Sequence, residues 1–182
     1  KIVFAGVGKT GDEMADALDA DIGQFNVESE EELEMLASLA AERGVQASVA
    51  LRVNPDVDAK THEKISTGRA TDKFGIEFNQ AEALYARGAQ MTGINMQGLA
   101  IHIGSQLTML EPFEAAFARL GELCQRVRAN GHKVTRLDLG GGLGISYADE
   151  ELLSLADYGA LVQRTARDFN AEITLEPGRW MA

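Results

Sequence analysis

Residues 136–144 read RLDLGGGLG, and this stretch decides how the rest of the sequence is interpreted. RLDL is typical of a buried strand, and four of the five residues after it are glycine. Glycine loses more conformational freedom on folding than any other residue, so a cluster of glycines at a strand end needs a physical reason. The dinucleotide pattern G-x-G-x-x-G fails because Ile145 and Tyr147 occupy the positions of its third glycine, and no Walker A lysine follows. Two interpretations stay open on the glycines alone: a nest of N–H groups for a phosphate, or a tight turn or bulge.

Short apolar runs alternate with longer amphipathic runs along the whole chain. The apolar runs, several of them continuous as in strands buried on both faces, predict strands at residues 1–5, 25–27, 48–53, 98–103, 136–139 and 173–175. The amphipathic runs predict helices at residues 10–20, 30–43, 79–89, 112–130 and 150–170. The expected helix signals are Thr10 with Glu13, Ser29 with Glu32, Asn79 with Glu82, Pro112 in a first turn and Gly131 as a stop. This order predicts one α/β domain with a parallel sheet and crossover helices.

Residues that could bind a ligand or take part in catalysis follow three successive predicted strands. His102 ends the strand in IHIGSQ, Gly140–Gly142 follow RLDL, and Glu176 and Arg179 follow the last strand in LEPGRW. These residues could also have a purely structural role, since a lone histidine is more often a core residue, and Glu176 could simply form an ion pair with Arg179. In a parallel α/β barrel, however, the C-terminal ends of all strands meet at one face, and loops after strands seven and eight often hold a phosphate. Taken together, the residues after these three strands predict one site with a phosphate nest.

The segment between Val53 and Asn79 is much longer than the usual connection of about 2–6 residues. It follows a strand, so it lies at the face where barrel enzymes place their active sites. The alternative is a surface insertion, but the apolar sequence KFGI favours a loop that folds back onto the protein.

Composition excludes several classes of function. Net charge is −11, which repels nucleic acid and anionic lipid. No apolar run approaches the roughly 18 residues of a membrane span, and no spacing of His, Cys, Asp and Glu predicts a metal site. The single cysteine, Cys124, fits a reducing cytoplasm and is predicted to be a small core residue. His62 and His132 lie in predicted loops and carry no signal.

The motifs HIGSQ, LDLGGGLGI and EPGR, in this order and spacing, resemble the barrel domain of the fold-type III pyridoxal-phosphate-dependent decarboxylases. The long segment LRVNPDVDAKTHEKISTGRATDKFGI and the sequence HIGSQLT resemble the diaminopimelate decarboxylase branch of that family. The resemblance covers essentially the whole chain. It implies a TIM-type (β/α)8 barrel, the cofactor pyridoxal 5′-phosphate, and decarboxylation of meso-diaminopimelate to L-lysine and CO₂ in a cytoplasmic homodimer that binds neither nucleic acid nor membrane.

The resemblance also implies a role for each matching residue. His102 is expected to stack on the pyridine ring and to be catalytic, and Glu176 is expected to pair with the ring nitrogen. Arg179 is expected to bind either the phosphate or a substrate carboxylate, because its planar fork suits both anions. The expected cofactor-binding residues are His102, Ser105, Gly140, Gly141, Gly142, Glu176, Gly178 and Arg179.

Two features of the family are not matched. The lysine that bonds to the cofactor lies in a YAxKAN-like strand, and none of Lys1, Lys9, Lys60, Lys64, Lys73 and Lys133 has that context. The C-terminal β-domain with its cysteine–acid motif is not matched either. Residues 1–182 are therefore expected to form a partial pyridoxal-phosphate-binding barrel, about strands 3 to 8, that is inactive alone. Related decarboxylases of ornithine, arginine or carboxynorspermidine, a non-catalytic pyridoxal-phosphate-binding barrel, and a sugar-phosphate-binding barrel remain alternatives.

Overall fold

Strands and helices alternate through the chain, as the sequence predicts. The computed structural model describes residues 2–57, 74–147 and 152–181. Its strands are β1 (Val3–Phe4), β2 (Gln24–Val27), β3 (Ala47–Asn54), β4 (Ile76–Glu77), β5 (Ile94–Ala100), β6 (Arg136–Asp138) and β7 (Glu172–Thr174). Its helices are α1 (Gly11–Asp19), α2 (Glu30–Arg43), α3 (Ala81–Gly88), α4 (Glu111–Ala129), α5 (Leu155–Phe169) and the 3₁₀ helix η1 (Gly178–Met181).

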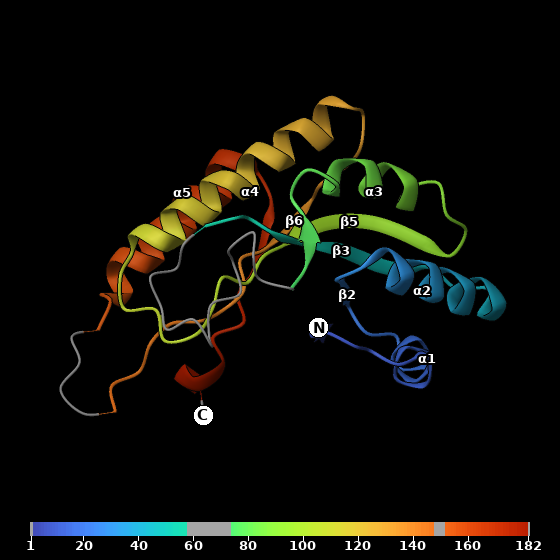
Figure 1. The fold of residues 1–182 in the computed structure, drawn as a ribbon, viewed down its shortest axis with the longest axis horizontal. Helices are drawn as coiled ribbons and strands as arrows, with labels where there is room; N and C mark the ends of the chain where they lie inside the picture. Colours follow the sequence, from blue (N-terminus) through green and yellow to red (C-terminus); the bar gives the residue numbers. More distant parts are fainter. Residues whose placement is uncertain (1, 58–73, 148–151, 182) are drawn as a thin grey trace.

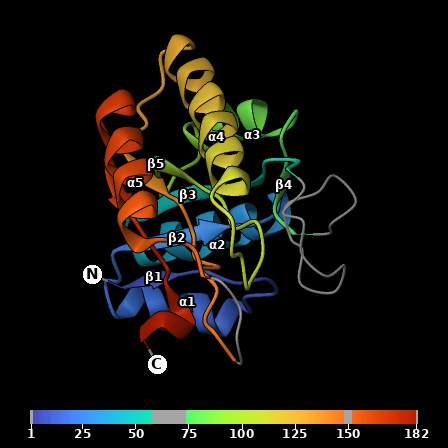
Figure 2. The ribbon, with the colours of Figure 1, turned by 90° about the vertical axis from the view of Figure 1, so that its left-hand side faces the viewer.

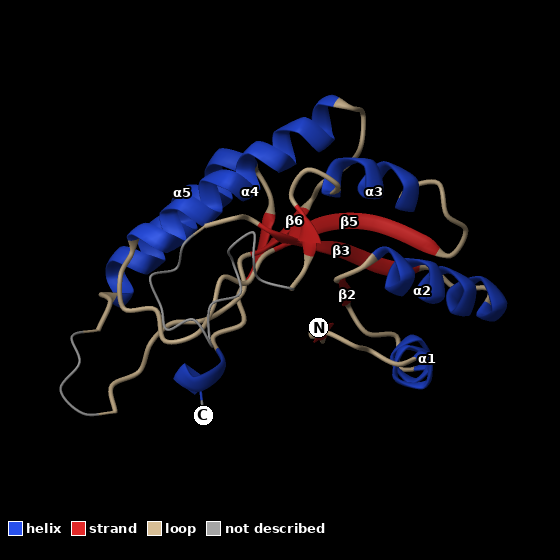
Figure 3. Cartoon of the chain, in the orientation of Figure 1, coloured by secondary structure: helices blue, strands red, loops and turns tan. Residues whose placement is uncertain are grey.

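The sheet is parallel and follows the chain order β1-β2-β3-β5-β6-β7, with β4 paired to β3 beside this path. The helices form an arc around the outside of the strands (Figures 1 and 3). After a quarter turn, α4 and α5 are seen side by side (Figure 2). Consecutive parallel strands joined by outer helices make a partial TIM-type barrel, which confirms the predicted fold class.

The helix signals at α1 and α4 are correct, and the signal at α2 is correct in part. Thr10 and Glu13 form both hydrogen bonds of a capping box, and α2 has the predicted bounds. Gly131 follows α4 with a φ of +86°, a value that glycine adopts without a side-chain penalty. At α2 only half of the predicted box is present. Ser29 accepts the Glu32 N–H, but the Glu32 carboxylate binds the N–H of Glu28 instead of that of Ser29.

Three boundary predictions are wrong. Asn79 does not cap α3, since Gln80 is the N-cap and makes no side-chain cap bond. Helix α5 starts at Leu155, because Ser154 accepts the N–H of Asp157 and caps it there. Strand β5 runs over Ile94–Ala100 rather than over residues 98–103, since polar residues alternate with buried ones in its first half and break up the apolar run; His102 therefore follows the strand instead of ending it.

The long segment folds back in the part that the structure describes. Ile76, from the sequence KFGI, pairs with Val53 and is 6% exposed, which confirms that prediction for residues 74–79. Residues 58–73, with His62, lie outside the described residues.

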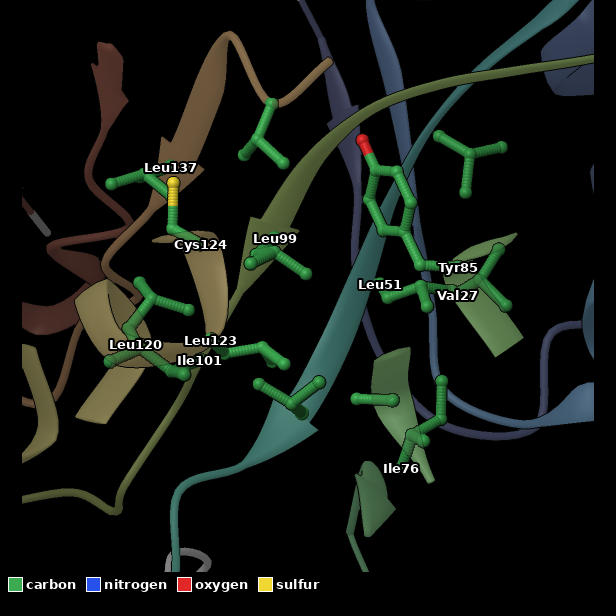
Figure 4. Close-up of a cluster of buried hydrophobic side chains, with 14 of the residues drawn as sticks. Val27, Leu51, Ile76, Tyr85, Leu99, Ile101, Leu120, Leu123, Cys124 and Leu137 are labelled. Carbon is green, nitrogen blue, oxygen red and sulfur yellow. The ribbon is translucent and has the colours of Figure 1, made fainter. Parts of the chain in front are cut away.

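The core lies between the sheet and its outer helices. Figure 4 shows side chains of the strands meeting those of α4 and Tyr85 of α3. Cys124 on α4 is fully buried in this cluster, so its prediction as a core residue is confirmed. Burial also raises the pKa of its thiol, which keeps it protonated and unreactive.

Candidate functional site

The inner face of the sheet carries a row of residues in register. This row consists of Arg52, Ala100, Asp138 and Thr174. Side chains alternate along a strand, so the positions two residues further on share the same face. Beyond the C-terminal ends of β5, β6 and β7, those positions are His102, Gly140 and Glu176. The ladder continues beyond the strands, because the Glu176 N–H donates to the Gly140 carbonyl at 2.8 Å. The three predicted strand ends therefore meet in one layer directly above the row.

Backbone packing explains the glycines. Gly140 and Gly142 have φ values of +68° and +99°, in the left-handed region. A Cβ at Gly140, Gly141 or Gly142 would overlap the carbonyl oxygen of Ile101, Glu176 or Gly104, respectively. The loops after β5, β6 and β7 approach so closely that no side chain fits between them. Tight turning and close approach thus account for these glycines without any ligand.

The N–H groups of the glycines have distinct uses. The Gly140 N–H donates to Asp138 Oδ1 at 2.9 Å, and the Gly141 N–H donates to His102 Nδ1 at 3.3 Å. The Gly142 N–H has no acceptor among the described residues. Of the predicted nest, only this last donor is open to a ligand.

His102 is held as a neutral ring in one tautomer. Burial, together with the positive charge of Arg52, lowers the pKa of His102 to about 4. Because Nδ1 accepts the Gly141 N–H, the ring proton belongs on Nε2. The side chain is half-buried and lies beside the glycine loop.

Glu176 lies in an acidic environment. Burial and the nearby carboxylate of Asp138 raise the pKa of Glu176 to about 7, and Arg52 opposes this only in part. Among the described residues, Glu176 and Arg179 do not form the ion pair that the sequence left open. A positively charged donor would complement this carboxylate.

Ser105 lies in a loop that is fixed against the glycine loop. The Leu107 N–H donates to the Gly142 carbonyl at 2.9 Å, and the Gly144 N–H donates to the Leu107 carbonyl at 3.0 Å. The Gln106 amide exchanges two hydrogen bonds of 3.0 Å with the backbone of Ile145. Ser105 is thereby held at the same rim as the glycines.

The last two predicted residues lie on η1. Gly178 has a φ of +54°, and Arg179 is exposed. Trp180 ties η1 to the rim, because its indole N–H donates to the Gly144 carbonyl at 2.9 Å. All the predicted site residues are therefore on segments that meet the glycine loop or directly follow β7.

Sequence reasoning missed a buried ionic group. The Arg52 guanidinium binds Glu28 Oε1 at 2.7 Å, and the Gly6 N–H donates to the same oxygen at 3.1 Å. Lys9 pairs with Glu32 beside it. Arg52 acts on both His102 and Glu176 through its charge. The available signal was an arginine within the apolar strand segment SVALRV and a glutamate directly after the predicted strand FNV.

No other histidine or lysine of the described residues reaches this layer. The ring of His132 lies beside that of Tyr85, tilted by 57° with a centroid distance of 5.9 Å. Lys9 is engaged by Glu32, and Lys133 precedes β6 and so lies at the opposite end of the strand. The other four lysines fall outside the described residues. Across residues 2–57, 74–147 and 152–181, no His, Cys, Asp and Glu side chains group as metal ligands.

A helix must be long and apolar to cross a membrane. Of the helices in the described ranges, none combines the length and the apolar character needed to cross a bilayer.

Comparison with known proteins gives one consistent match. Residues 1–182 match the family described as "Pyridoxal-dependent decarboxylase, pyridoxal binding domain". Diaminopimelate decarboxylase of Pseudomonas aeruginosa is 50% identical over 179 residues, and that of Zymomonas mobilis is 49% identical over 181 residues; each alignment covers 98% of this chain and 43% of the relative. The crystal structure of diaminopimelate decarboxylase from Helicobacter pylori complexed with L-lysine superposes with a TM-score of 0.93 at 36% identity, covering 98% of this chain and 45% of that one. The chain spans less than half the length of these relatives.

Proposed function

The chain belongs to the pyridoxal-dependent decarboxylase family and matches its pyridoxal-binding domain, and from this premise we propose that it forms the cofactor-binding part of a diaminopimelate decarboxylase. The full-length protein would convert meso-diaminopimelate to L-lysine and CO₂. The observation that carries the proposal is the meeting of His102, the glycine loop and Glu176 in one layer of the barrel. Identity near 50% to two diaminopimelate decarboxylases supports this substrate over other basic amino acids.

The residues of the site fit pyridoxal 5′-phosphate. Glu176 is a carboxylate among acids, which suits a protonated ring nitrogen. His102 offers a neutral flat ring, so it adds no second positive charge beside that nitrogen. The open N–H of Gly142 and the hydroxyl of Ser105 are donors for a phosphate at the same rim.

The residues of the predicted phosphate site fall into two groups. Gly140 and Gly141 shape the loop and direct their N–H groups to Asp138 and His102. Gly142, Ser105, Gly178 and Arg179 are the groups left to bind the phosphate, with Arg179 also able to reach a substrate carboxylate from its exposed position.

The chain's own contribution to the reaction is electrostatic. When bound, pyridoxal phosphate supplies an electron sink for the charge left on the substrate carbon after CO₂ departs. A protonated ring nitrogen beside Glu176 would lower the pKa of Glu176 from about 7, so Glu176 would be a carboxylate there and would hold the proton on that nitrogen. The Gly141 N–H keeps His102 in the tautomer with its proton on Nε2.

The partners and location of the full-length protein are part of the same proposal. It would act as a homodimer in the cytoplasm, as the family resemblance implies. The excess of acidic residues, with a net charge of −11, and the single buried cysteine support an intracellular enzyme that does not bind nucleic acid.

A turnover assay of the full-length protein with added pyridoxal phosphate tests the proposal. L-Lysine release from meso-diaminopimelate is expected, with ornithine, arginine and carboxynorspermidine as competing substrates. Turnover of one of those alone would reject the substrate, and cofactor binding without any turnover would reject the activity.

A matched pair of variants tests the site. Glu176→Gln is expected to lower turnover by about 10²-fold or more, as removal of an electrostatic group in a reacting site does. Glu172→Gln is the control, because Glu172 is an exposed residue at the other end of the same strand, paired with Arg136. Equal rates for the two variants would contradict the role of Glu176.

A further inference from the structure

Asp138 is the acidic residue of the inner row, and it is 1% exposed. Both of its oxygens are bound. Oδ2 accepts from Asn26 Nδ2 at 2.7 Å, and Oδ1 accepts the Gly140 N–H at 2.9 Å. Asn26 is itself oriented by Gln24, whose Nε2 donates to Asn26 Oδ1 at 2.8 Å. Such a fully bonded carboxylate has one fixed position.

This group of hydrogen bonds crosses the barrel. Asn26 is on β2 and Asp138 is on β6, and β3 and β5 lie between these strands in the sheet. The bond therefore joins two strands that are not neighbours, through the interior of the barrel. It fixes the distance between opposite parts of the curved sheet at the level of Asp138.

The glycine loop depends on the same carboxylate. Gly140 has a φ of +68°, and its N–H is held by Asp138. The Gly140 carbonyl in turn accepts the Glu176 N–H, and the next residue, Gly141, donates to His102. Asp138 is thus connected through Gly140 to both groups of the proposed site.

We propose that Asp138, held by Asn26 across the barrel, is a positioning residue that fixes the glycine loop, and with it His102 and Glu176, for binding the cofactor. This inference rests on the proposed function for the identity of the cofactor, but the geometry of the loop can be tested without it.

Asp138→Ala in the full-length protein is the first test. Without its acceptor, the Gly140 N–H is left unpaired in a buried position, and the loop is no longer held in its conformation. The dissociation constant for pyridoxal phosphate, measured by titration of the absorption band of bound cofactor, is expected to rise about tenfold to a hundredfold. This range corresponds to the loss of a hydrogen bond to a charged group. Amide hydrogen exchange at residues 139–144 of the cofactor-free protein is expected to become faster.

Thr165→Val is the matched control. Thr165 is also buried, at 5% exposure, and its hydroxyl donates to the Leu161 carbonyl at 3.0 Å on α5, away from the loop. This variant is expected to leave both cofactor affinity and exchange at residues 139–144 as in the wild type. Unchanged affinity and exchange in folded Asp138→Ala, or equal changes in Thr165→Val, would overturn the proposal.

A charge swap keeps the test decisive if Asp138→Ala does not fold. In the double variant Asn26→Asp with Asp138→Asn, the amide at position 138 can accept the Gly140 N–H and donate to the carboxylate at position 26. Exchange at residues 139–144 is expected to return to the wild-type rate. Fast exchange in the folded swap would reject the positioning role.

The two proposals fail in different ways. If the wild-type protein binds pyridoxal phosphate but does not decarboxylate diaminopimelate, the proposed function fails, and the cofactor titration still tests Asp138. If the wild-type protein does not bind the cofactor, hydrogen exchange alone decides the role of Asp138.

Discussion

The two faces of the same three strands have opposite chemistry. One row in register contains Leu51, Leu99 and Leu137, all fully buried against the outer helices (Figure 4). The row one residue further along contains Arg52, Ala100 and Asp138, which face the interior of the barrel. A shift of one residue therefore separates apolar packing from a buried group of charges. The leucine row stabilises the sheet, whereas the inner row arranges the groups that end each strand.

This difference has a physical cause. The outer row is covered by helices, whose apolar side chains exclude water and reward any well-packed hydrocarbon. The inner row lies beneath a rim where loops must present polar groups, so its charges need partners: Glu28 for Arg52 and Asn26 for Asp138. Changes in the outer row should thus affect stability alone, and changes in the inner row should also affect the site.

Arg52→Met is expected to have the largest effect. It leaves Glu28, whose side chain is 4% exposed, without its cation, and breaking a buried pair from one side costs about 3–5 kcal/mol. Urea unfolding of the full-length protein measures this loss. Arg43→Met is the control, because Arg43 pairs with Asp19 on the surface, where a pair contributes about 0–1 kcal/mol. Similar losses in both variants would contradict the importance of burial in the inner row.

Leu99→Ala tests the outer row. Removal of a fully buried leucine side chain is expected to lower the free energy of unfolding by about 2–5 kcal/mol. Cofactor affinity of the folded protein should not change. Leu155→Ala is the control, since Leu155 is 48% exposed and should lose less than about 1 kcal/mol. A large fall in cofactor affinity with Leu99→Ala would show that the two rows are not separable.

The residues of the rim could be predicted from the sequence because they follow the strands directly. His102, the glycines and Glu176 come straight after apolar runs, and parallel strands bring such positions to one face. The partner of each residue could not be predicted in this way. The RLDL run did not show that Asp138 faces Asn26, which is 112 residues away, because only the closed curvature of the sheet brings them together.

The reason for the glycines was also beyond the sequence. A phosphate nest and a tight turn predict the same residues, and only the positions of the neighbouring loops distinguish them. The carbonyl groups of Ile101, Gly104 and Glu176 exclude side chains at this point, and none of them belongs to the glycine motif. Helix boundaries failed for a simpler reason. Asn79 and Ser154 are both residue types that cap helices well, but Ser154 caps α5 and Asn79 does not cap α3.

The pH dependence of stability should show that Glu176 lies among acidic groups. The pKa of Glu176 is about 7 in the folded, cofactor-free protein, above its ordinary value of 4.5. Since the folded state binds this proton more tightly than the unfolded state, the stabilisation is complete below pH 4.5 and is lost as pH rises through 7. Glu176 therefore contributes a fall in the free energy of unfolding of up to about 1.4 kcal/mol per pH unit in this window. His102, whose pKa is lowered from 6.5 to about 4, contributes an opposing rise between those two pH values, so the contribution of Glu176 is the difference in slope between the wild type and Glu176→Gln.

Glu176→Gln should remove this contribution, so that the free energy of unfolding falls less, or rises more, with pH than in the wild type. Urea unfolding at pH 5, 6, 7 and 8 measures the difference. Glu172→Gln, at the exposed end of β7, should keep the slope of the wild type. A Glu176→Gln variant with the wild-type slope would assign the titration to another group.

Cys124→Ala is expected to have the smallest effect and sharpens the division between the rows. Cys124 packs on the outer side of the sheet, close to Leu99 and Leu137 (Figure 4). Exchange of the buried thiol for hydrogen removes a small apolar volume and should cost about 1 kcal/mol, near the value for one buried methylene group. Cofactor affinity and turnover should stay at the wild-type level, because Cys124 packs on the face of the sheet opposite to the site.

Alkylation of the thiol gives a second measurement. Since burial raises the thiol pKa, iodoacetamide should label Cys124 in urea but not in the folded protein. Labelling of the folded protein, or loss of cofactor affinity in Cys124→Ala, would place the outer row within reach of the site.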